Sequence, residues 1–430
     1  MAQKIGFISL GCSKNLVDTE MMIGYYKENG YEIVNNPTEA EVLVINTCGF
    51  IESAKQEAID TILEMADYKT KNCKKLVVTG CLVERYKEEL EKELPEVDLF
   101  IPIKEYDQIF NKLDYLKREI TTGKNFAYLR IADGCSNYCT YCAIPYIRGP
   151  LKSRTIEDIL EEAKKLEQDG YKEIILIAQD TARFGMDIYG EPKLVELLKE
   201  LVKFDFKWIR FLYAYPEMIT DELIDVVVEN EKICNYFDIP IQHISDSVLK
   251  RMGRKSNGET IRNCINKIRK KIPDAILRTS LIVGFPGENM MDFDELCNFV
   301  EETKFDRLGV FKYSAEDGTP AVKLKDHIPE ERKEDRLDII MSIQQEISNE
   351  NNQKLIGKKL KCIIDGVTED GEMYITRSYM DVPDIDGFVF VKKEKEHEIG
   401  EFIECVVKDA FDYDLVAEEI VTNIWKSASW

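Results

Sequence analysis

Three cysteines form a Cys-x3-Cys-x2-Cys run, at Cys135, Cys139 and Cys142, just after an apolar, strand-like segment. Thiolates are the usual protein ligands of iron–sulfur clusters, and a cubane cluster contains four irons. A loop with three cysteines therefore leaves one iron without a protein ligand. That iron can bind an outside molecule, so the spacing predicts a [4Fe–4S] cluster that takes part in chemistry.

Two other interpretations of this loop are less favoured. A closed structural zinc site needs four ligands, and neither a fourth Cys nor a His lies near the run. Disulfides are typical of secreted chains. The twelve cysteines in 430 residues have motif-like spacings, and no apolar signal segment precedes them. These features predict an intracellular metalloprotein.

Three further cysteines each follow a strand-like apolar run. The runs and their cysteines are Ile5–Leu10 with Cys12, Val42–Ile45 with Cys48, and Leu76–Val78 with Cys81. Because the carboxyl ends of parallel strands lie along one edge of a sheet, these three thiols should converge. A glycine adjoins each cysteine and allows the backbone to approach a bound group closely, as a second cluster would require. Three buried structural cysteines are the alternative. That alternative is preferred for the six cysteines without this placement: Cys73, Cys234, Cys264, Cys297, Cys362 and Cys405.

Length and charge limit the possible functions. A chain of 430 residues is long enough for about three domains. No apolar run reaches membrane-spanning length, which predicts a soluble, cytoplasmic protein. The 58 Lys and Arg against 80 Asp and Glu give a net charge of −22. This surplus argues against a protein whose main task is to hold a polyanion, and it favours a basic partner.

The first 125 residues predict a parallel α/β unit. The three apolar runs are rich in β-branched residues, as expected for strands buried on both faces. Helical segments separate them. One is predicted to begin at Ser53, whose hydroxyl could cap the free amides while Gln56 reaches back. Another runs from Leu16 to Asn29 and stops at Gly30.

From about residue 126 to 315 the chain alternates strand and helix six times, which predicts a partial parallel barrel with its site at the strand carboxyl ends. The expected strands are Tyr128–Ala132, Ile174–Ala178, Trp208–Tyr213, Phe237–Ile241, Ile276–Val283 and Leu308–Tyr313. The helix after the cysteine loop is well specified, because Thr155 can cap it and Gly170 can end it. The cysteine loop follows the first strand and therefore lies on the catalytic edge.

Other polar residues should meet the cysteine loop at this edge. Gln179 follows the second strand, Gln242 and His243 the fourth, and Gly284 and Glu288 the fifth. Such residues could hold a small ligand with amino, carboxylate and ribose groups, with Gly284 allowing close backbone approach. The alternative for each is structural: a turn, a helix cap at Glu288, or a hydrogen-bonded core histidine at His243.

The C-terminal part predicts a small β-barrel. A helix-like connector over 332–352 leads to residues 355–423, where apolar and polar positions alternate between turn signals at Asp370-Gly371 and Asp386-Gly387. This segment carries eight Lys or Arg against seventeen Asp or Glu, a net charge of −9. A nucleic-acid-binding barrel should be basic. The acidity favours docking of a basic protein, although it could equally serve solubility.

Taken together, these residues carry a family resemblance that extends over essentially the whole chain. The Cys135, Cys139 and Cys142 run resembles that of radical S-adenosylmethionine (SAM) enzymes. Combined with Cys12, Cys48, Cys81 and a small C-terminal β domain of the TRAM type, it resembles the methylthiotransferases. Three segments are similar to the branch that methylthiolates an aspartate of small-subunit ribosomal protein twelve: Ser9–Asp18, Ala178–Thr181 and Asp384–Gly387. The tRNA-modifying branch typically has Gln-Met-Asn where this chain has Ser13-Lys14-Asn15, and Gly-Gln-Asn-Val where it has Ala178–Thr181.

The resemblance implies a two-cluster enzyme. The [4Fe–4S] cluster on Cys135, Cys139 and Cys142 would bind SAM and cleave it to a 5′-deoxyadenosyl radical, which takes hydrogen from the aspartate β-carbon. The cofactor supplies that difficult step and the protein supplies position. The second [4Fe–4S] cluster, on Cys12, Cys48 and Cys81, would carry the methylated sulfur. By position, the residues expected to hold SAM are Gln179, Gln242, Arg278, Gly284 and Glu288.

The resemblance also sets domain limits and partners. It implies an N-terminal methylthiotransferase domain over 1–125, a radical SAM domain with a helical connector over 126–353, and a TRAM domain over 354–424. The expected partners are ribosomal protein twelve and a low-potential electron donor such as a flavodoxin or ferredoxin, with the enzyme a monomer away from the membrane. Two alternatives are a tRNA adenosine methylthiotransferase and a non-enzymatic iron–sulfur protein that carries electrons or senses iron.

Overall fold

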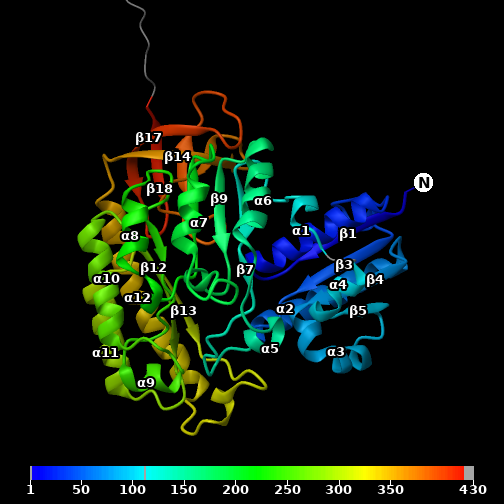
Figure 1. Ribbon diagram of the computed structural model, residues 1–430, viewed down its shortest axis with the longest axis horizontal. Coiled ribbons are helices and arrows are strands. Elements are labelled where there is room, and N and C mark those ends of the chain that lie inside the picture. The colour runs from blue at the N-terminus through cyan, green and yellow to red at the C-terminus, as the bar shows by residue number, and fades with distance from the viewer. Residues whose placement is uncertain (1, 111–112, 421–430) are drawn as a thin grey trace, which may run out of the picture.

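The computed structural model describes residues 2–110 and 113–420. Figure 1 shows an N-terminal α/β unit in blue and cyan, a larger central unit in green and yellow, and a small barrel in orange and red above the central unit. The N-terminal unit packs beside the central one at the end that carries α5 and β7 (Figure 1). Among the described helices, none is both long and apolar enough to cross a membrane.

The N-terminal unit is a parallel sheet covered by helices. Its strands run in the order β2-β1-β3-β4-β5, all parallel. They are β1 (Lys4–Ser9), β2 (Glu32–Ile33), β3 (Val42–Thr47), β4 (Lys75–Gly80) and β5 (Leu99–Ile101), and the helices are α1 (Ser13–Glu28), α2 (Glu52–Ala66), α3 (Cys81–Glu93) and α4 (Tyr106–Ile109). Separate apolar clusters pack on the two faces of the sheet, as the apolar runs predicted. The cap predicted at Ser53 is wrong: α2 begins one residue earlier, at Glu52, and has no side-chain cap.

The central unit is an incomplete parallel barrel. Two three-stranded parallel sheets, β10-β9-β6 and β11-β12-β13, meet at a bridge between Ile209 and Ile233. The strands are β6 (Phe126–Arg130), β9 (Glu173–Ile177), β10 (Trp208–Phe211), β11 (Tyr236–Asp238), β12 (Ile276–Val283) and β13 (Arg307–Lys312). All six predicted strands are therefore present, with ends shifted by a few residues. One large apolar core fills the space between these strands and their helices.

Helices cover the outside of this barrel. They are α6 (Ile156–Gln168), α7 (Leu194–Leu201), α8 (Asp221–Val228), α9 (Asp246–Arg251), α10 (Gly258–Lys271) and α11 (Met290–Thr303). The Thr155 hydroxyl caps α6 by accepting a 3.2 Å hydrogen bond from the Asp158 amide, as predicted. The cysteine loop lies between a short antiparallel pair, β7 (Ala132–Asp133) and β8 (Lys152–Ser153), and is followed by α5 (Ile144–Arg148).

The C-terminal unit is a closed barrel that follows the long helix α12 (Glu330–Gln353). Its strands close in the order β14-β15-β16-β18-β17. They are β14 (Lys359–Val367), β15 (Met373–Arg377), β16 (Val389–Lys392), β17 (Phe402–Ala410) and β18 (Leu415–Glu419). The predicted end of this domain, residue 424, lies outside the described residues.

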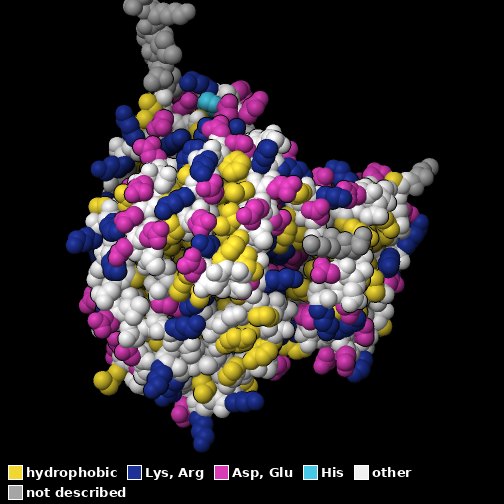
Figure 2. Space-filling model, in the orientation of Figure 1, with side chains coloured by type: hydrophobic (Ala, Val, Ile, Leu, Met, Phe, Trp, Pro, Cys, Tyr) yellow, Lys and Arg dark blue, Asp and Glu magenta, His cyan; other side chains and the backbone are white. Residues whose placement is uncertain are grey.

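Some of the acidic residues of this small barrel form ion pairs with the central unit. Asp381 pairs with Arg307 of β13 at 2.6 Å. Arg377 of the small barrel pairs with the buried Glu173 of β9 at 3.0 Å, and Glu173 also pairs with Arg210. On the face shown in Figure 2, acidic and basic side chains are interspersed over all three units. The count of charges in the sequence therefore overstates how acidic the free surface is.

Candidate functional site

Three of the predicted ligand cysteines lie at the carboxyl edge of the N-terminal sheet. Cys12 directly precedes α1, Cys48 follows β3, and Cys81 follows β4 as the first residue of α3. Strands β1, β3 and β4 are neighbours and parallel, so the three turns lie side by side. Cys12 is exposed, Cys48 is half-buried and Cys81 is buried. The sheet thus brings this triad, which we call the sheet-edge triad, to one place.

Glycines allow the three turns to pack closely. A Cβ on Gly11 would lie 2.7 Å from the Cβ of Cys48, and one on Gly49 would lie 2.7 Å from the Cα of Leu82. Gly80 has a φ of 101°, and a Cβ there would lie 2.4 Å from Asn46 Oδ1. Any side chain at these positions would push the turns apart. The glycines next to the cysteines are therefore needed for the triad to converge.

Asn15 ties the three turns together from the first turn of α1. Its side-chain amide donates hydrogen bonds of 3.0 Å to the carbonyl oxygens of Leu10 and Thr47. Its Oδ1 lies 3.5 Å from the Cys81 sulfur and can accept a hydrogen bond from that thiol. Asn15 is a site residue that the sequence alone did not reveal. The available signal was that Asn15 lies three residues after Cys12. Its contacts with Thr47 and Cys81 come from distant parts of the chain, so the sequence did not indicate them.

The second set of cysteines, which we call the loop triad, is held by backbone hydrogen bonds. The Cys135 amide donates to the carbonyl of Gly149 at 3.0 Å, and the Thr140 amide donates to the carbonyl of Met252 at 2.9 Å, just after α9. Gly134 has a φ of 65°, and a Cβ there would lie 2.2 Å from the Pro150 carbonyl oxygen. Cys135 and Cys139 are buried and Cys142 is half-buried. The central unit thus fixes the loop from several sides.

The chemistry of both triads fits iron–sulfur clusters. Burial raises the pKa of Cys135 to about 11 and that of Cys81 to about 12, and it raises the pKa of Cys142 still further. A metal centre binds the thiolate and releases the proton, so these soft ligands would be deprotonated only with the metal in place. Among the described residues, no three His, Cys, Asp or Glu side chains lie close enough to hold a single metal ion.

Arg148 of α5 connects the two triads. Its Nη2 donates to Asn15 Oδ1 at 2.7 Å and to Asp18 Oδ2 at 2.8 Å, and it lies 3.9 Å from the Cys81 sulfur. Its Nη1 pairs with Asp133, next to the loop triad, at 3.2 Å. The side chain is 1% exposed. The segment that carries the loop triad therefore contacts a predicted ligand of the sheet-edge triad, and Arg148 forms a wall that the two triads share.

The residues predicted to hold SAM divide into two groups. Gln179, Gln242 and Gly284 lie at the carboxyl end of the barrel strands, where the prediction expected them. Gln242 has a φ of 69°, and its amide donates to the Ser280 carbonyl at 2.9 Å. Next to Gln179, the buried Asp180 accepts a 2.9 Å hydrogen bond from Asn137 of the cysteine loop. The strand ends and the cysteine loop therefore form one edge.

Glu288 and Arg278 have protein partners instead. Glu288 accepts a 2.9 Å hydrogen bond from the Phe285 amide and pairs with Arg336 of α12 at 2.9 Å. Its side chain is fully buried, and burial raises its pKa to about 6. Arg278 lies near the start of β12 and pairs with Asp238 at 2.8 Å and with Asp386 of the C-terminal barrel at 3.7 Å. Neither side chain is free in this structure.

His243 is wholly buried behind the same edge. Its Nδ1 accepts a 3.0 Å hydrogen bond from the Ser245 amide, and its Nε2 has no hydrogen-bond partner among the described residues. Burial lowers its pKa to about 3, so the ring is neutral at physiological pH. These features agree with the structural alternative for this residue.

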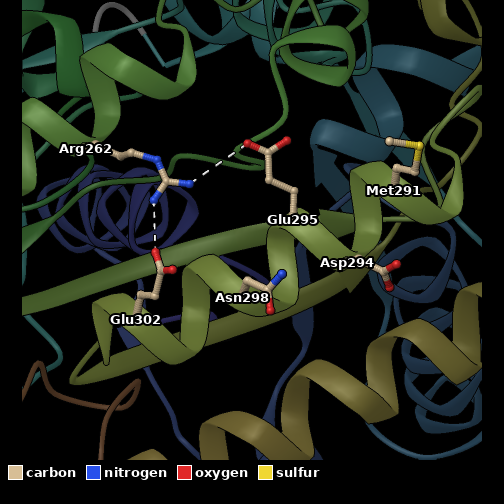
Figure 3. Close-up of a pocket in the computed structure, with 6 residues that line it drawn as sticks. All are labelled: Arg262, Met291, Asp294, Glu295, Asn298 and Glu302. Carbon is tan, nitrogen blue, oxygen red and sulfur yellow. Dashed lines mark hydrogen bonds and ion pairs between the residues drawn. The ribbon is translucent and has the colours of Figure 1, made fainter.

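A surface pocket lies away from both triads. It has a volume of about 450 Å³ and is lined by Arg262 of α10 together with residues of α11. Figure 3 shows Arg262 reaching toward Glu295 and Glu302, at 4.0 and 3.4 Å. No cysteine lines this pocket, and its side chains come from the outer helices. The chemistry of the cysteines therefore points to the two triads and not to this hollow.

Three family models match the chain. Their descriptions are "Uncharacterized protein family UPF0004" for residues 4–102, "Radical SAM superfamily" for residues 129–300 and "TRAM domain" for residues 356–420. Each match falls within one of the three units of the fold, and the radical SAM match ends before β13 of the central unit.

Solved structures of low sequence identity share the fold. A radical SAM methyltransferase, TsrM from Kitasatospora setae, superposes with a TM-score of 0.57 at 10% identity, over 80% of this chain and 89% of that one. The cobalamin-dependent SAM radical enzyme OxsB gives a TM-score of 0.50 at 12% identity, over 79% of this chain and 56% of that one.

Curated relatives match at much higher identity. The ribosomal protein uS12 methylthiotransferase RimO of Alkaliphilus oremlandii is 60% identical over 96% of this chain and 98% of its own length. RimO of Acetivibrio thermocellus is 49% identical over 98% and 99%, and that of Clostridioides difficile is 51% identical over 96% and 98%. Given this similarity over nearly the full length, the chain belongs to the RimO family of radical SAM methylthiotransferases.

Proposed function

We propose that the protein adds a methylthio group to the β-carbon of an aspartate in small-subunit ribosomal protein uS12. One observation carries this proposal: two cysteine triads, one in a loop and one at a sheet edge, share a wall at Arg148. Radical generation and sulfur delivery must act on the same carbon, so the two centres that perform them have to lie side by side. The proposed domains span 1–125, 126–353 and 354–424.

Each triad would hold one [4Fe–4S] cluster. Cys135, Cys139 and Cys142 would hold the cluster that binds SAM, and Cys12, Cys48 and Cys81 the cluster that carries sulfur. When bound, the first cluster and SAM supply the radical that takes hydrogen from the substrate carbon, and the second supplies the methylthio group. Gly11, Gly49 and Gly80 allow the sheet-edge turns that carry these cysteines to pack closely.

The chain's remaining site residues position these groups. Asn15 and Arg148 hold Cys81 through contacts of 3.5 and 3.9 Å to its sulfur. Gln179, Gln242 and Gly284 are proposed to contact SAM directly. Arg278 and Glu288 were predicted for the same role, but their ion pairs with Asp238 and Arg336 favour a supporting one.

The partners follow from charge and chemistry. The net charge of −22 suits a basic protein substrate better than tRNA. The acidic C-terminal barrel would dock uS12 through those carboxylates that do not pair with the central unit. A flavodoxin or ferredoxin would supply electrons to a monomeric enzyme in the cytoplasm.

Intact-mass analysis of uS12 tests the proposal. The anaerobically reconstituted enzyme, with SAM and a reductant, should add a methylthio increment to uS12 and none to tRNA nucleosides. The variant Cys12→Ala should lose this product but still form 5′-deoxyadenosine, whereas Cys135→Ala should lose both. Each variant should retain about four irons per chain instead of about eight.

Two outcomes would replace the proposal. A methylthio increment on tRNA instead of uS12 would assign the chain to nucleoside modification. The absence of 5′-deoxyadenosine from the reduced, fully loaded protein would favour an electron carrier or iron sensor.

A further inference from the structure

Lys14 projects from the sheet-edge triad into the space between the two units. It lies two residues after Cys12 in the first turn of α1 and is 4% exposed. Its Nζ lies 3.4 Å from the centroid of the Tyr213 ring, just beyond the end of β10. The side chain therefore crosses from the edge of the N-terminal sheet to the mouth of the barrel.

The guanidinium groups around this space already have carboxylate partners. Arg130 pairs with Asp18 at 2.5 Å, and Arg148 pairs with Asp18 and Asp133 at 2.8 and 3.2 Å. In these pairs the carboxylates offset the positive charge of the guanidinium groups. Each of these two arginines therefore already has a carboxylate partner in the fold.

Asp238, the carboxylate on the barrel side of Lys14, also has partners of its own. Asp238 accepts a 3.0 Å hydrogen bond from the Tyr213 amide and pairs with Arg278 at 2.8 Å. In the described part of the chain no carboxylate lies within ion-pair distance of Lys14 Nζ, which faces the Tyr213 ring. A buried ammonium has three donors to satisfy and is costly to leave without an anion. The site therefore presents a positive charge that lacks an anionic partner.

We propose that Lys14 binds the carboxylate of the substrate aspartate. The inference rests on the proposed function and adds the residue that recognises the target side chain. The carboxylate of an aspartate is bonded directly to its β-carbon, so an ion pair at Lys14 would place the reacting carbon beside Cys12 and at the barrel mouth, between the two triads. The contact also distinguishes aspartate from asparagine, because an ammonium binds a charged carboxylate more strongly than a neutral amide.

Binding measurements with paired variants test this assignment. The dissociation constant of uS12 is measured for the reconstituted enzyme with Lys14, Lys14→Met and Lys14→Arg, using uS12 that carries its target aspartate or an asparagine in that place. Lys14→Met should weaken binding of the aspartate form by about 10- to 100-fold. It should change binding of the asparagine form little, so the two substitutions are not additive. Lys14→Arg should restore part of the affinity.

Controls separate this role from others. Lys199→Met removes a half-exposed lysine of α7 and should leave both affinities unchanged. Iron content and thermal unfolding of Lys14→Met report whether the fold and both triads survive. If Lys14→Met weakens both forms of uS12 equally, the lysine serves the fold or offsets the charge of the triad, and the assignment fails.

Failure of the proposed function would look different. If the unaltered enzyme neither binds nor modifies uS12, the proposed function fails and the role of Lys14 with it. If the unaltered enzyme binds and modifies uS12 and Lys14→Met binds the aspartate form equally well, only the role of Lys14 is overturned.

Discussion

The two cysteine triads are assembled in different ways. The loop triad comes from one short segment, Cys135 to Cys142, held by backbone hydrogen bonds to Gly149 of the same loop and to Met252 after α9. The sheet-edge triad comes from three turns spread over Cys12 to Cys81, and these turns meet only after β1, β3 and β4 have paired. The first triad depends on local sequence and the second on tertiary structure. Damage to the N-terminal sheet should therefore affect the second triad first.

This difference between the triads also explains where the glycines lie. Gly11, Gly49 and Gly80 sit where one turn of the sheet edge touches the next, and each would clash if it carried a side chain. In the loop triad the corresponding close contact is that of Gly134 with the Pro150 carbonyl oxygen, within the same loop. Close packing thus fixes the distance between separate turns in one triad and the shape of a single loop in the other.

Replacing Arg148 removes the side chain that contacts Cys81 of the sheet-edge triad and Asp133 beside the loop triad. Of the predicted changes, this one should have the largest effect on stability. Removing one partner of a buried ion pair leaves uncompensated charge and costs about 3 to 5 kcal/mol of unfolding free energy. Arg148→Met would leave both Asp18 and Asp133 with one partner fewer. Denaturant unfolding of the oxygen-free, iron-loaded protein measures the cost. Iron should be lost from the sheet-edge triad first, because Arg148 contacts Cys81.

Arg262→Met is the matched control for Arg148→Met. Arg262 also faces two carboxylates, Glu295 and Glu302 (Figure 3). Its side chain, however, is 39% exposed. Exposed pairs contribute about 0 to 1 kcal/mol. Equal costs for the two variants would mean that Arg148 does not hold the wall.

A glycine substitution at the sheet edge tests the tertiary dependence directly. A Cβ at Gly49 would lie 2.7 Å from backbone atoms of Leu82, which cannot move without shifting α3. Gly49→Ala should therefore cost about 3 kcal/mol, the upper end of the usual range for overpacking. It should also lower the iron held by the sheet-edge triad and spare the loop triad. Iron quantitation measures the total loss of iron, and formation of 5′-deoxyadenosine reports whether the loop triad keeps its share.

Gly366→Ala controls for the loss of a glycine. Gly366 lies in β14 and has no atom within 4 Å of the position its Cβ would take. The variant should keep the iron of both triads. If Gly49→Ala also kept both, close packing of the turns would not be what gathers the sheet-edge cysteines.

The sequence was informative where the signal was local or followed from topology. The loop triad is one contiguous motif, and the cap at Thr155 needs only the next three residues. The sheet-edge triad could be predicted because Cys12, Cys48 and Cys81 each follow a strand, and parallel strands place their ends along one edge. The cap at Ser53 was wrong because α2 starts at Glu52, one residue earlier.

Partners that come from distant parts of the chain could not be predicted. Arg148 reaches from the central unit to Asn15 and Asp18, more than a hundred residues away. The acidic surplus of the C-terminal barrel gave no sign that Asp381 would pair with Arg307. Residue type and position in the sequence placed Gln179, Gln242 and Gly284 at the carboxyl ends of the barrel strands. The pairing of each charge, in contrast, required the assembled fold.

The smallest predicted effect on stability concerns Glu288. It tests whether the polar residues at the barrel edge serve the fold or bind a ligand. Burial raises the pKa of Glu288 to about 6, above the ordinary value of 4.5. Between these values the folded protein holds a proton that the unfolded chain has released, so stability falls as pH rises from about 4.5 to about 6 and is level above. The shift corresponds to about 2 kcal/mol. Glu288→Gln should lack this part of the pH dependence.

Unfolding free energies of the unaltered protein and of Glu288→Gln, measured across that pH range, give the difference in slope. If Glu288 also binds SAM, the variant should bind SAM more weakly, whatever the difference in slope. The ion pair with Arg336 of α12 favours the structural outcome, because it already neutralises the carboxylate. In that case the barrel edge, like the sheet edge, gains its shape from buried side chains, and the ligand contacts fall to Gln179, Gln242 and the backbone at Gly284.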